Sequence, residues 1–273
     1  MPELPEVEII KKGLSSKLQD TPLVQIKIIH SHCIYPHKTS LNQLLQQKIR
    51  NISRRGKLLI FHFSEDKLLV FHLKMTGKLI LTQNLKKELD KHTHVIFQFP
   101  KHHLLFKDIR KFGFIRLFTY KELAQWSFWQ NLGPEPFAIS SLDFAQKIKK
   151  SKATIKSLLL NQGIIAGLGN IYTDESLFAA NIHPLSKGYK IPLTQLKNLH
   201  KKIIYVLNKA INLGGSSFKD YVNTLGEKGA FQEHFAVYSR AGKNCVNCNQ
   251  KLIKLKVAGR TTVLCSQCQK KYE

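Results

Sequence analysis

Short apolar segments separated by turn or polar residues fill the first half of the chain. Four of them, at residues 58–63, 67–72, 93–99 and 103–106, are rich in Ile, Val, Leu and Phe. Runs of this length and composition are typical of strands in an antiparallel sandwich or barrel. The first half of the sequence therefore predicts a β-rich domain.

One helix is expected ahead of these strands. Proline suits the first turn of a helix, where its missing N–H would have no partner, and Pro5 suits such a position. An apolar face at helical spacing follows, made of Val7, Ile10, Leu14 and Leu18. The β-rich domain is thus predicted to begin with a helix.

The pattern changes near the Gly-Pro-Glu-Pro stretch at residues 133–136. Helical periodicity then runs through residues 142–148, 154–160, 171–180 and 193–213. The stretch between the second and third of these segments is broken by Gly163, Gly167 and Gly169. Near the end, residues 253–257 alternate apolar and lysine side chains before an Ala-Gly turn, which predicts a β-hairpin.

These patterns together predict an α+β protein in three parts. Residues 1–133 are expected to form an antiparallel β-sandwich domain with its leading helix, residues 134–238 a helical domain, and residues 239–273 a cysteine-bearing hairpin. No internal repeat or low-complexity segment interrupts this order.

Four of the five cysteines form two C-x2-C pairs that are 16 residues apart, namely Cys245, Cys248, Cys265 and Cys268. Each such turn directs two thiolates at one tetrahedral ion, so the spacing predicts one structural Zn²⁺ with no open coordination position. Two disulfides are the alternative, which a reducing cytosol disfavours. Cys33 stands alone and is interpreted as a small buried residue.

The charge of the chain indicates a polyanionic partner. Lys and Arg number 43 and Asp and Glu 18, which gives a formal net charge of +25 with histidine neutral. Nucleic acid is the first candidate, and an anionic membrane surface the second. No apolar run approaches the roughly 20 residues of a spanning helix, and the acidic start does not resemble a signal peptide. The protein is therefore expected to be cytoplasmic.

The start of the chain, MPELPEVEII, also carries candidate chemistry. If Met1 is removed, Pro2 offers a secondary amine that condenses with an aldehyde to a cationic iminium, and covalent amine catalysis is an established strategy. Glu3 beside it, or Glu6 one helical turn away, could act as a general acid. The alternative is that the prolines stiffen a helix entry and the glutamates favour its positive end. On these residues alone the alternative is favoured.

Further motifs favour the catalytic interpretation instead. Both the motifs and their order along the chain resemble the formamidopyrimidine-DNA glycosylase family of bacterial base-excision enzymes. They are MPELPEVE, RRGK at 54–57, HLKMTG at 72–77, KHTH at 91–94, DIRKFG at 108–113, LGPEP at 132–136, GLGNIY at 167–172, SLFAANIHP at 176–184, GGSS at 214–217, GEKGAF at 226–231 and VAGRTTVLCSQCQ at the end. The resemblance spans almost the whole chain. It implies a catalytic N-terminal domain, a helix–two-turn–helix element in the helical domain and a zinc-finger hairpin.

The resemblance implies four catalytic residues. Pro2 would attack C1′ of the damaged nucleotide's sugar, and Glu3 would be the acid that assists sugar opening or base departure. Lys57 would donate during β-elimination, although without its RRGK context a solvated lysine between strands is favoured. Arg260 would serve the δ-elimination step or bind phosphate. Glu6 is kept as the next candidate acid.

The resemblance also implies residues that fill the gap left by an extruded base, namely Met75, Arg110 and Phe112. Met75 and Phe112 taken individually are more often core residues, but Arg-x-Phe next to a glycine suits an exposed loop. Ile109 and Lys111 flank Arg110 where relatives commonly carry Pro and Arg, so details of the loop are expected to differ.

Phosphate contacts are expected from several places. Asn170 lies where a glycine-rich turn meets the start of a helix, so its side-chain amide and the neighbouring N–H groups can bind an anion. Asn170 could also be the N-cap of that helix, and the two roles are compatible. The family resemblance points to His92, with His94 as the alternative if the register slips. It also points to a basic run that contains Lys149, Lys150 and Lys152. Of these three, Lys150 is the candidate phosphate ligand. Residues 226–231 resemble a segment that covers a flipped purine.

The resemblance as a whole implies a bifunctional DNA glycosylase and AP lyase. The protein is expected to excise 8-oxoguanine and formamidopyrimidines from damaged double-stranded DNA by β,δ-elimination, as a monomer in the bacterial cytoplasm, associated with the nucleoid through DNA. The competing interpretations are the same fold acting on oxidised pyrimidines, and a zinc-dependent DNA-binding protein without catalytic activity.

Overall fold

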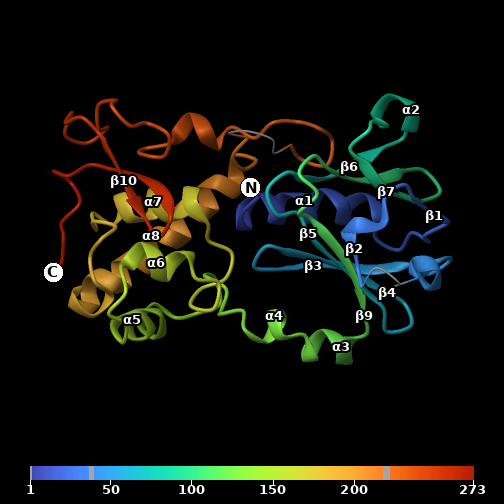
Figure 1. Cartoon of the computed structure of the whole chain (residues 1–273), viewed down its shortest axis with the longest axis horizontal. Coiled ribbons are helices and arrows are strands. Elements are labelled where there is room, and N and C mark those ends of the chain that lie inside the picture. Colours follow the sequence, from blue (N-terminus) through green and yellow to red (C-terminus); the bar gives the residue numbers. More distant parts are fainter. Residues whose placement is uncertain (1, 37–39, 218–221) are drawn as a thin grey trace. The chain divides into compact units, whose positions relative to one another are not determined.

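The computed structural model describes residues 2–36, 40–217 and 222–273 (Figure 1). The chain divides into two compact units. The first contains residues 1–130 and 213–230, and the second contains residues 131–212 and 231–273. In the described part of the chain, no helix is both long and apolar enough to cross a membrane.

The first unit begins with helix α1 (Leu4–Leu18), as predicted. Pro5 lies in its first turn, and Glu6 places a negative charge at the positive end of the helix. The predicted apolar face is buried to within 1% exposure, and consists of Val7, Ile10, Leu14 and Leu18. Burial of this face fixes which side of α1 meets the sheets.

Two sheets make up the rest of the first unit. One has the order β1 (Gln25–Ile28), β7 (Thr93–Gln98), β8 (His103–Asp108) and β6 (Gly77–Thr82). The other has the order β2 (Ile34–Tyr35), β9 (Phe114–Phe118), β5 (Leu68–His72), β4 (Leu58–Phe63) and β3 (Ile49–Arg55). All pairings are antiparallel except the short β2–β9 pair, which is parallel.

The inner faces of these sheets share one hydrophobic core with α1. Phe61 and Phe71 come from the five-stranded sheet, Phe97 and Phe106 from the four-stranded sheet, and Leu14 from the helix. Aromatic rings meet across it, with the Phe71 and Phe97 centroids 5.8 Å apart. Cys33 belongs to this core and is 1% exposed, which confirms its interpretation as a buried residue. The predicted β-sandwich is therefore confirmed.

Three short helices complete the first unit. They are α2 (Leu85–Glu88), α3 (Tyr120–Gln125) and α4 (Ser127–Gln130). Residues 213–230 also group with this unit rather than with the helices that precede them in sequence.

The second unit contains the four predicted helices. They are α5 (Ser141–Lys149), α6 (Ile155–Leu160), α7 (Asn170–Ala179) and α8 (Leu193–Asn212). The nine residues between α6 and α7 are held by Gln162, whose side chain accepts from Gly167 N at 2.9 Å and donates to Leu168 O at 2.8 Å. The positive φ of Gly167, 97°, allows this close turn.

The last part of the second unit is the predicted hairpin of β10 (Ile253–Val257) and β11 (Arg260–Leu264). Ala258 and Gly259 connect the strands, and their φ values of 50° and 71° fit a two-residue turn with both central residues left-handed. Val263 joins Phe178 of α7 and Cys265 in a small apolar cluster. The hairpin thus packs with the helices, whereas the sequence interpretation placed it in a segment of its own. As limits of separately folding domains, the boundaries at 133 and 238 remain predictions.

Candidate functional site

Pro2 and Glu3, the proposed amine and acid, are both buried at the start of α1. Glu3 is 2% exposed, and its backbone N–H donates to Glu6 Oε2 at 2.8 Å. Glu6 Oε1 accepts from the backbone N–H of Ser216 at 2.8 Å, so both carboxylate oxygens have a backbone donor. Glu6 is itself 2% exposed. This geometry makes Glu6 an anchor of the terminus, and the Glu3 side chain, which accepts from the Glu6 backbone in the same capping box, is the carboxyl next to the proline.

The RRGK motif forms the turn between β3 and β4. Gly56 adopts φ 59°, which suits the first central residue of a two-residue hairpin turn. Lys57 follows it and is 7% exposed. The interpretation of Lys57 as a solvated lysine between strands is therefore wrong, because the fold buries its side chain.

The two arginines of the motif fix this turn. Arg54 Nε donates to Glu8 Oε2 at 3.0 Å, and Arg54 Nη1 donates to Gly56 O at 3.0 Å, which links α1 to the Lys57 turn. Partial burial acts to raise the pKa of Glu8, but hydrogen bonds from Lys11 and Arg54 outweigh it and the pKa is lowered. Arg55 stacks over the Trp129 ring at 4.3 Å.

His72, the first residue of the HLKMTG motif, lies at the end of β5. Its Nδ1 accepts from Lys74 N at 2.9 Å. Burial lowers its pKa to about 3, with smaller contributions from the charges of Lys74 and Lys57. His72 is therefore a neutral imidazole close to Lys57. A histidine closing an otherwise apolar strand was the only available signal, and its burial could not be read from that pattern.

The three expected gap-filling residues come together on two loops of the first unit. Met75 lies before β6, and Arg110 and Phe112 lie after β8. Arg110 stacks over the Phe112 ring at 5.0 Å, and its Nη1 lies 3.3 Å from Met75 Sδ. Met75 is 37% and Phe112 56% exposed, so neither is a core residue. An exposed group of this kind suits insertion between bases.

The structure separates the two candidate histidines. His94 is 1% exposed, and its Nε2 bonds to Asp108 O at 2.7 Å. His92 is half-buried, and its backbone O accepts from Asp108 N at 3.0 Å. Of the two rings, that of His92 is the one that solvent or a phosphate can reach.

Asn170 and the Arg260 hairpin are joined in the second unit. Asn170 is the first residue of α7 and Gly169 is its N-cap, so the N-cap interpretation of Asn170 is wrong by one position. Its Nδ2 donates to Thr261 O at 3.0 Å, next to Arg260. Arg260 is exposed at the first position of β11. The positive end of α7 and an exposed guanidinium therefore share one part of this unit.

A buried ion pair holds that part of the hairpin. Lys156 Nζ lies 2.7 Å from Asp174 Oδ1, and the two side chains are 0% and 1% exposed. Lys156 also donates to Thr262 Oγ1, and Val263 N donates to Asp174 Oδ2 at 3.3 Å. Burial raises the pKa of Asp174 to about 7 although the Lys156 ammonium opposes it. The pair thus ties α6 and α7 to β11.

The lysines of the basic run at the end of α5 lie in different environments. Lys149 Nζ donates to Ile191 O at 2.9 Å within the protein. Lys150, at the C-cap, and Lys152 are exposed. An exposed ammonium is the better phosphate ligand, which favours Lys150 or Lys152 over Lys149.

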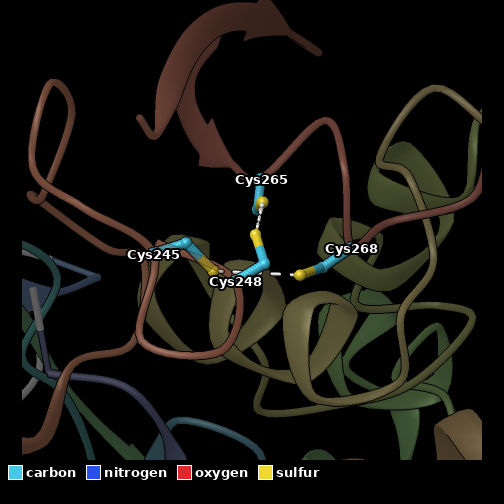
Figure 2. Close-up of side chains that lie close together, drawn as sticks. All are labelled: Cys245, Cys248, Cys265 and Cys268. Carbon is cyan, nitrogen blue, oxygen red and sulfur yellow. Dashed lines mark hydrogen bonds between the residues drawn. The ribbon is translucent and has the colours of Figure 1, made fainter. Parts of the chain in front are cut away.

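The four paired cysteines converge from two loops, as Figure 2 shows. Their sulfurs all lie within 4.8 Å of one another, and the Cys245–Cys268 and Cys248–Cys265 separations are 3.9 and 3.5 Å. Four sulfurs about 2.3 Å from a tetrahedral zinc ion lie about 3.8 Å apart, whereas a disulfide is about 2 Å long. The residues fit a metal ion and not two disulfides.

Residues 222–230, around the segment expected to cover a flipped base, are anchored to the sandwich at two points. Thr224 O accepts from Leu81 N at 2.8 Å, and a Cβ on Gly13 of α1 would lie 2.6 Å from Thr224 Oγ1. Val222 packs against the apolar cluster of Ile80, Ile96 and Leu105. The GGSS motif, at residues 214–217, immediately precedes the four residues 218–221, which lie outside the described part of the chain.

Two family models match most of the chain. The formamidopyrimidine-DNA glycosylase N-terminal domain matches residues 1–115, and the formamidopyrimidine-DNA glycosylase H2TH domain matches residues 132–222. The second model covers α6, α7 and their two-turn connection.

Curated relatives carry the same name. The formamidopyrimidine-DNA glycosylase of Lactococcus lactis subsp. lactis is 39% identical over 275 residues, which cover 99% of this chain and 100% of the relative. That of Halalkalibacterium halodurans is 41% identical over 277 residues, with the same two coverages.

Solved structures of similar fold are complexes with damaged DNA. A Lactococcus lactis FPG mutant with Fapy-dG-containing DNA has a TM-score of 0.91 at 37% identity, covering 99% of this chain and 100% of that one. Lactococcus lactis Fpg with abasic-site DNA has a TM-score of 0.90 at 37% identity, covering 98% and 100%.

Proposed function

The chain belongs to the formamidopyrimidine-DNA glycosylase family, and we propose that it is a bifunctional glycosylase and AP lyase for oxidised purines, including 8-oxoguanine and formamidopyrimidines, in duplex DNA. The observation that carries this proposal is the buried Pro2–Glu3 start, which Glu6 fixes through the Glu3 backbone. Binding alone needs neither a terminal secondary amine nor a carboxyl beside it. The DNA complexes of the similar Lactococcus proteins support damaged DNA as the substrate.

Base release would begin at Pro2 once Met1 has been removed. The proline nitrogen forms a bond to C1′ while the bond from C1′ to the base breaks, and the base leaves with that electron pair and gains a proton. Glu3 supplies the proton that sugar opening or base departure requires. The nitrogen then loses its own proton, and its lone pair forms a C=N bond as the C1′–O4′ bond breaks and O4′ takes up a proton. The product is an open-chain iminium between Pro2 and C1′, whose positive charge makes it an electron sink.

Strand cleavage follows from that iminium. Loss of a proton from C2′ lets the C3′–O bond break with the 3′ phosphate as leaving group, and a second elimination expels the 5′ phosphate. Lys57, buried on its fixed turn, serves proton transfer in the first elimination. Arg260, exposed at the start of β11, serves the second or holds its phosphate.

Access to C1′ requires the damaged nucleotide to leave the duplex, at a cost of a few kcal/mol. The exposed group of Met75, Arg110 and Phe112 would fill the resulting gap and offset this cost. Asn170, His92 and Lys150 would hold the phosphates and fix the register.

The cysteine site would hold one structural Zn²⁺ per chain. Four thiolates complete its coordination, so the ion would supply rigidity and no reacting position. By fixing the loops next to β11 it would keep Arg260 in place. We place the protein in the bacterial cytoplasm, associated with the nucleoid through DNA, as a monomer.

A nicking assay on defined duplexes tests the proposal. The substrates are matched duplexes that carry 8-oxoguanine, a formamidopyrimidine, an oxidised pyrimidine, an abasic site or no damage. The expected order is the two oxidised purines well above the oxidised pyrimidine, with both ends of the gap phosphorylated. Faster cleavage of the oxidised pyrimidine would move the protein to the pyrimidine-specific interpretation. Binding without any nicking would make it a DNA-binding protein without catalytic activity.

Glu3→Gln separates the acid from the amine in the same assay. The amide keeps the size of the side chain but cannot donate a proton in the same way, so excision should fall by about 100- to 10,000-fold. An abasic site already presents an aldehyde, so Glu3→Gln should still nick abasic DNA appreciably. A normal excision rate would show that Glu3 is not the acid.

A further inference from the structure

One buried carboxylate joins the two loops that carry the gap-filling residues. Asp108 is the last residue of β8 and pairs with Gly77, the first residue of β6, so the loop before β6 and the loop after β8 leave the sheet at the same end. The side chain of Asp108 is buried although the neighbouring Arg110 is exposed. A buried carboxylate needs several donors to offset its desolvation.

The donors to Asp108 come from both loops. Thr76 Oγ1 donates to Asp108 Oδ1 from the first loop. From the second loop, Arg110 N donates to Oδ1 at 3.2 Å and Gly113 N to Oδ2 at 2.7 Å. The same Arg110 N–H also donates to Thr76 Oγ1 at 3.1 Å. The Thr76 hydroxyl, the Asp108 carboxylate and the Arg110 amide are therefore all hydrogen-bonded to one another.

The backbone of Asp108 extends this set to the adjoining strand. Its N–H donates to His92 O at 3.0 Å, and its carbonyl bonds to His94 Nε2 at 2.7 Å. The loops themselves have little freedom to compensate. Gly77 turns so tightly that a Cβ there would lie 2.4 Å from Leu73 O, and a Cβ on Gly113 would lie 3.0 Å from Asp108 Oδ2.

We propose that Thr76 and Asp108 form a clasp that holds Met75, Arg110 and Phe112 in the arrangement needed for insertion into DNA before any DNA is bound. Among the described residues, the ring and hydrogen-bond contacts of these three exposed side chains run between Arg110 and the other two, and contacts between exposed side chains are too weak to order two loops. Because the clasp orders the two loops before DNA is bound, recognition of damaged DNA no longer carries most of the entropic cost of ordering them. Thr76 and Asp108 are thus positioning residues for the extruded-base state, and this rests on the proposed function.

Thr76→Val tests the clasp, because it removes the hydroxyl and keeps the shape. Thr82→Val is the matched control, since Thr82 lies at the other end of β6, where its hydroxyl bonds to the Asn84 backbone. Thr76→Ser restores the hydroxyl. Amide hydrogen exchange without DNA is the first measurement. Exchange at Arg110 and Gly113 should become at least 10-fold faster in Thr76→Val, and stay near the parent rate in Thr82→Val and Thr76→Ser.

DNA binding is the second measurement, made with a duplex that carries a stable abasic analogue and with the undamaged duplex. Thr76→Val should weaken binding to the damaged duplex about 10-fold, and change binding to the undamaged duplex less than twofold. A fluorescent base opposite the lesion should report less insertion, while nicking at saturating DNA stays within about threefold of the parent.

Unchanged exchange at Arg110 and Gly113, or equal losses on both duplexes, would overturn the clasp. Asp108→Asn tests the clasp in a second way. The asparagine side chain keeps one acceptor oxygen, and its NH2 group replaces the other oxygen and cannot accept a hydrogen bond. If the parent protein itself does not prefer the damaged duplex, the proposed function fails, and the exchange measurement still decides whether the clasp orders the loops.

Discussion

Two hairpins carry the two cations proposed for strand cleavage, and they present them in opposite ways. Lys57 follows a glycine in the β3–β4 turn and is 7% exposed, with Arg54 joining that turn to α1. Arg260 follows a glycine in the β10–β11 turn and is exposed. The hairpin of Arg260 is fixed along β11 by Asn170 and the Lys156–Asp174 pair, and at its base by the cysteine site.

The difference suits two kinds of work. A group that transfers protons benefits from burial, because a low dielectric strengthens its electrostatic interactions and makes its pKa easy to adjust. A group that binds phosphate needs access and a fixed base, since an arginine keeps its charge in water. The first hairpin thus depends on contacts at its turn, and the second on contacts along strand β11 and at the cysteine site.

Loss of the metal should have the largest effect, and it should affect only the second hairpin. Cys248→Ser should reduce zinc from about one ion per chain to near zero, since structural zinc contributes on the order of 10 kcal/mol to its own module. Cys33→Ala is the control, because Cys33 is buried in the other unit. Elemental analysis and nicking of abasic DNA are the measurements. A parent protein that is fully active without metal would contradict a structural zinc.

Breaking the Lys156–Asp174 pair should have the next largest effect. Lys156→Met leaves Asp174 buried without its cation, which should lower the free energy of unfolding by about 3–5 kcal/mol. Adding Asp174→Leu should recover much of that loss, because no unpaired charge remains. Denaturant unfolding measures both, and the exposed Lys201→Met is the control. A double variant no more stable than the single one would argue against the pair as the cause.

Removal of Arg54 should disturb the first hairpin by less. Arg54→Met loses the bond to Glu8 and the bond to Gly56 O, a cost of about 2–3 kcal/mol. Nicking should fall as well, because the Lys57 turn loses its link to α1. Arg50→Met on the same strand is the matched control, since its contact to Asp20 is 3.7 Å and exposed. Equal losses in both variants would show that the Arg54 contacts are not specific.

The smallest effect should be a pH dependence that comes from His72. Its folded pKa, about 3, lies below the usual value of 6.5 because the ring is buried, so the unfolded chain binds the proton more tightly. Its contribution to stability is therefore full above about pH 6.5 and is lost as the pH falls toward 3. Between pH 7 and 5 the loss should be about 2 kcal/mol.

His72→Asn keeps an acceptor for Lys74 N and cannot titrate. The variant should therefore lose about 2 kcal/mol less than the parent between pH 7 and 5 in denaturant unfolding. The same pH dependence in both proteins would mean that His72 is protonated in the folded state.

Local patterns were sufficient to predict much of the fold. The face of α1, four strands, four helices, the hairpin turn and the cysteine cluster all follow from spacing. Strands β1, β2, β3, β6 and β9 were not predicted, and in β3 the reason is that Arg50, Arg54 and Arg55 interrupt its apolar alternation. In the structure these arginines bond to Glu8 or stack on Trp129, or remain in solvent, and such partners are invisible in a local window.

The site was predicted less completely, for a related reason. Most of the residues expected to reach DNA or sugar came from family motifs, and the roles of all of them remain predictions. Their supports are buried polar residues whose partners are distant in sequence, such as Asp108 with Thr76 and Lys156 with Asp174. In a sequence a buried lysine on a helix looks the same as a solvated one. Only the fold distinguishes them.

The central claim is a covalent intermediate at Pro2, and borohydride trapping on damaged duplex DNA tests it most directly. The protein with Met1 removed, as verified by mass spectrometry, should be trapped on 8-oxoguanine DNA, and peptide mapping should place the crosslink at Pro2. A variant with a tag retained ahead of Pro2 should give no adduct. Efficient trapping of the tagged variant, or a crosslink at a lysine, would contradict the account.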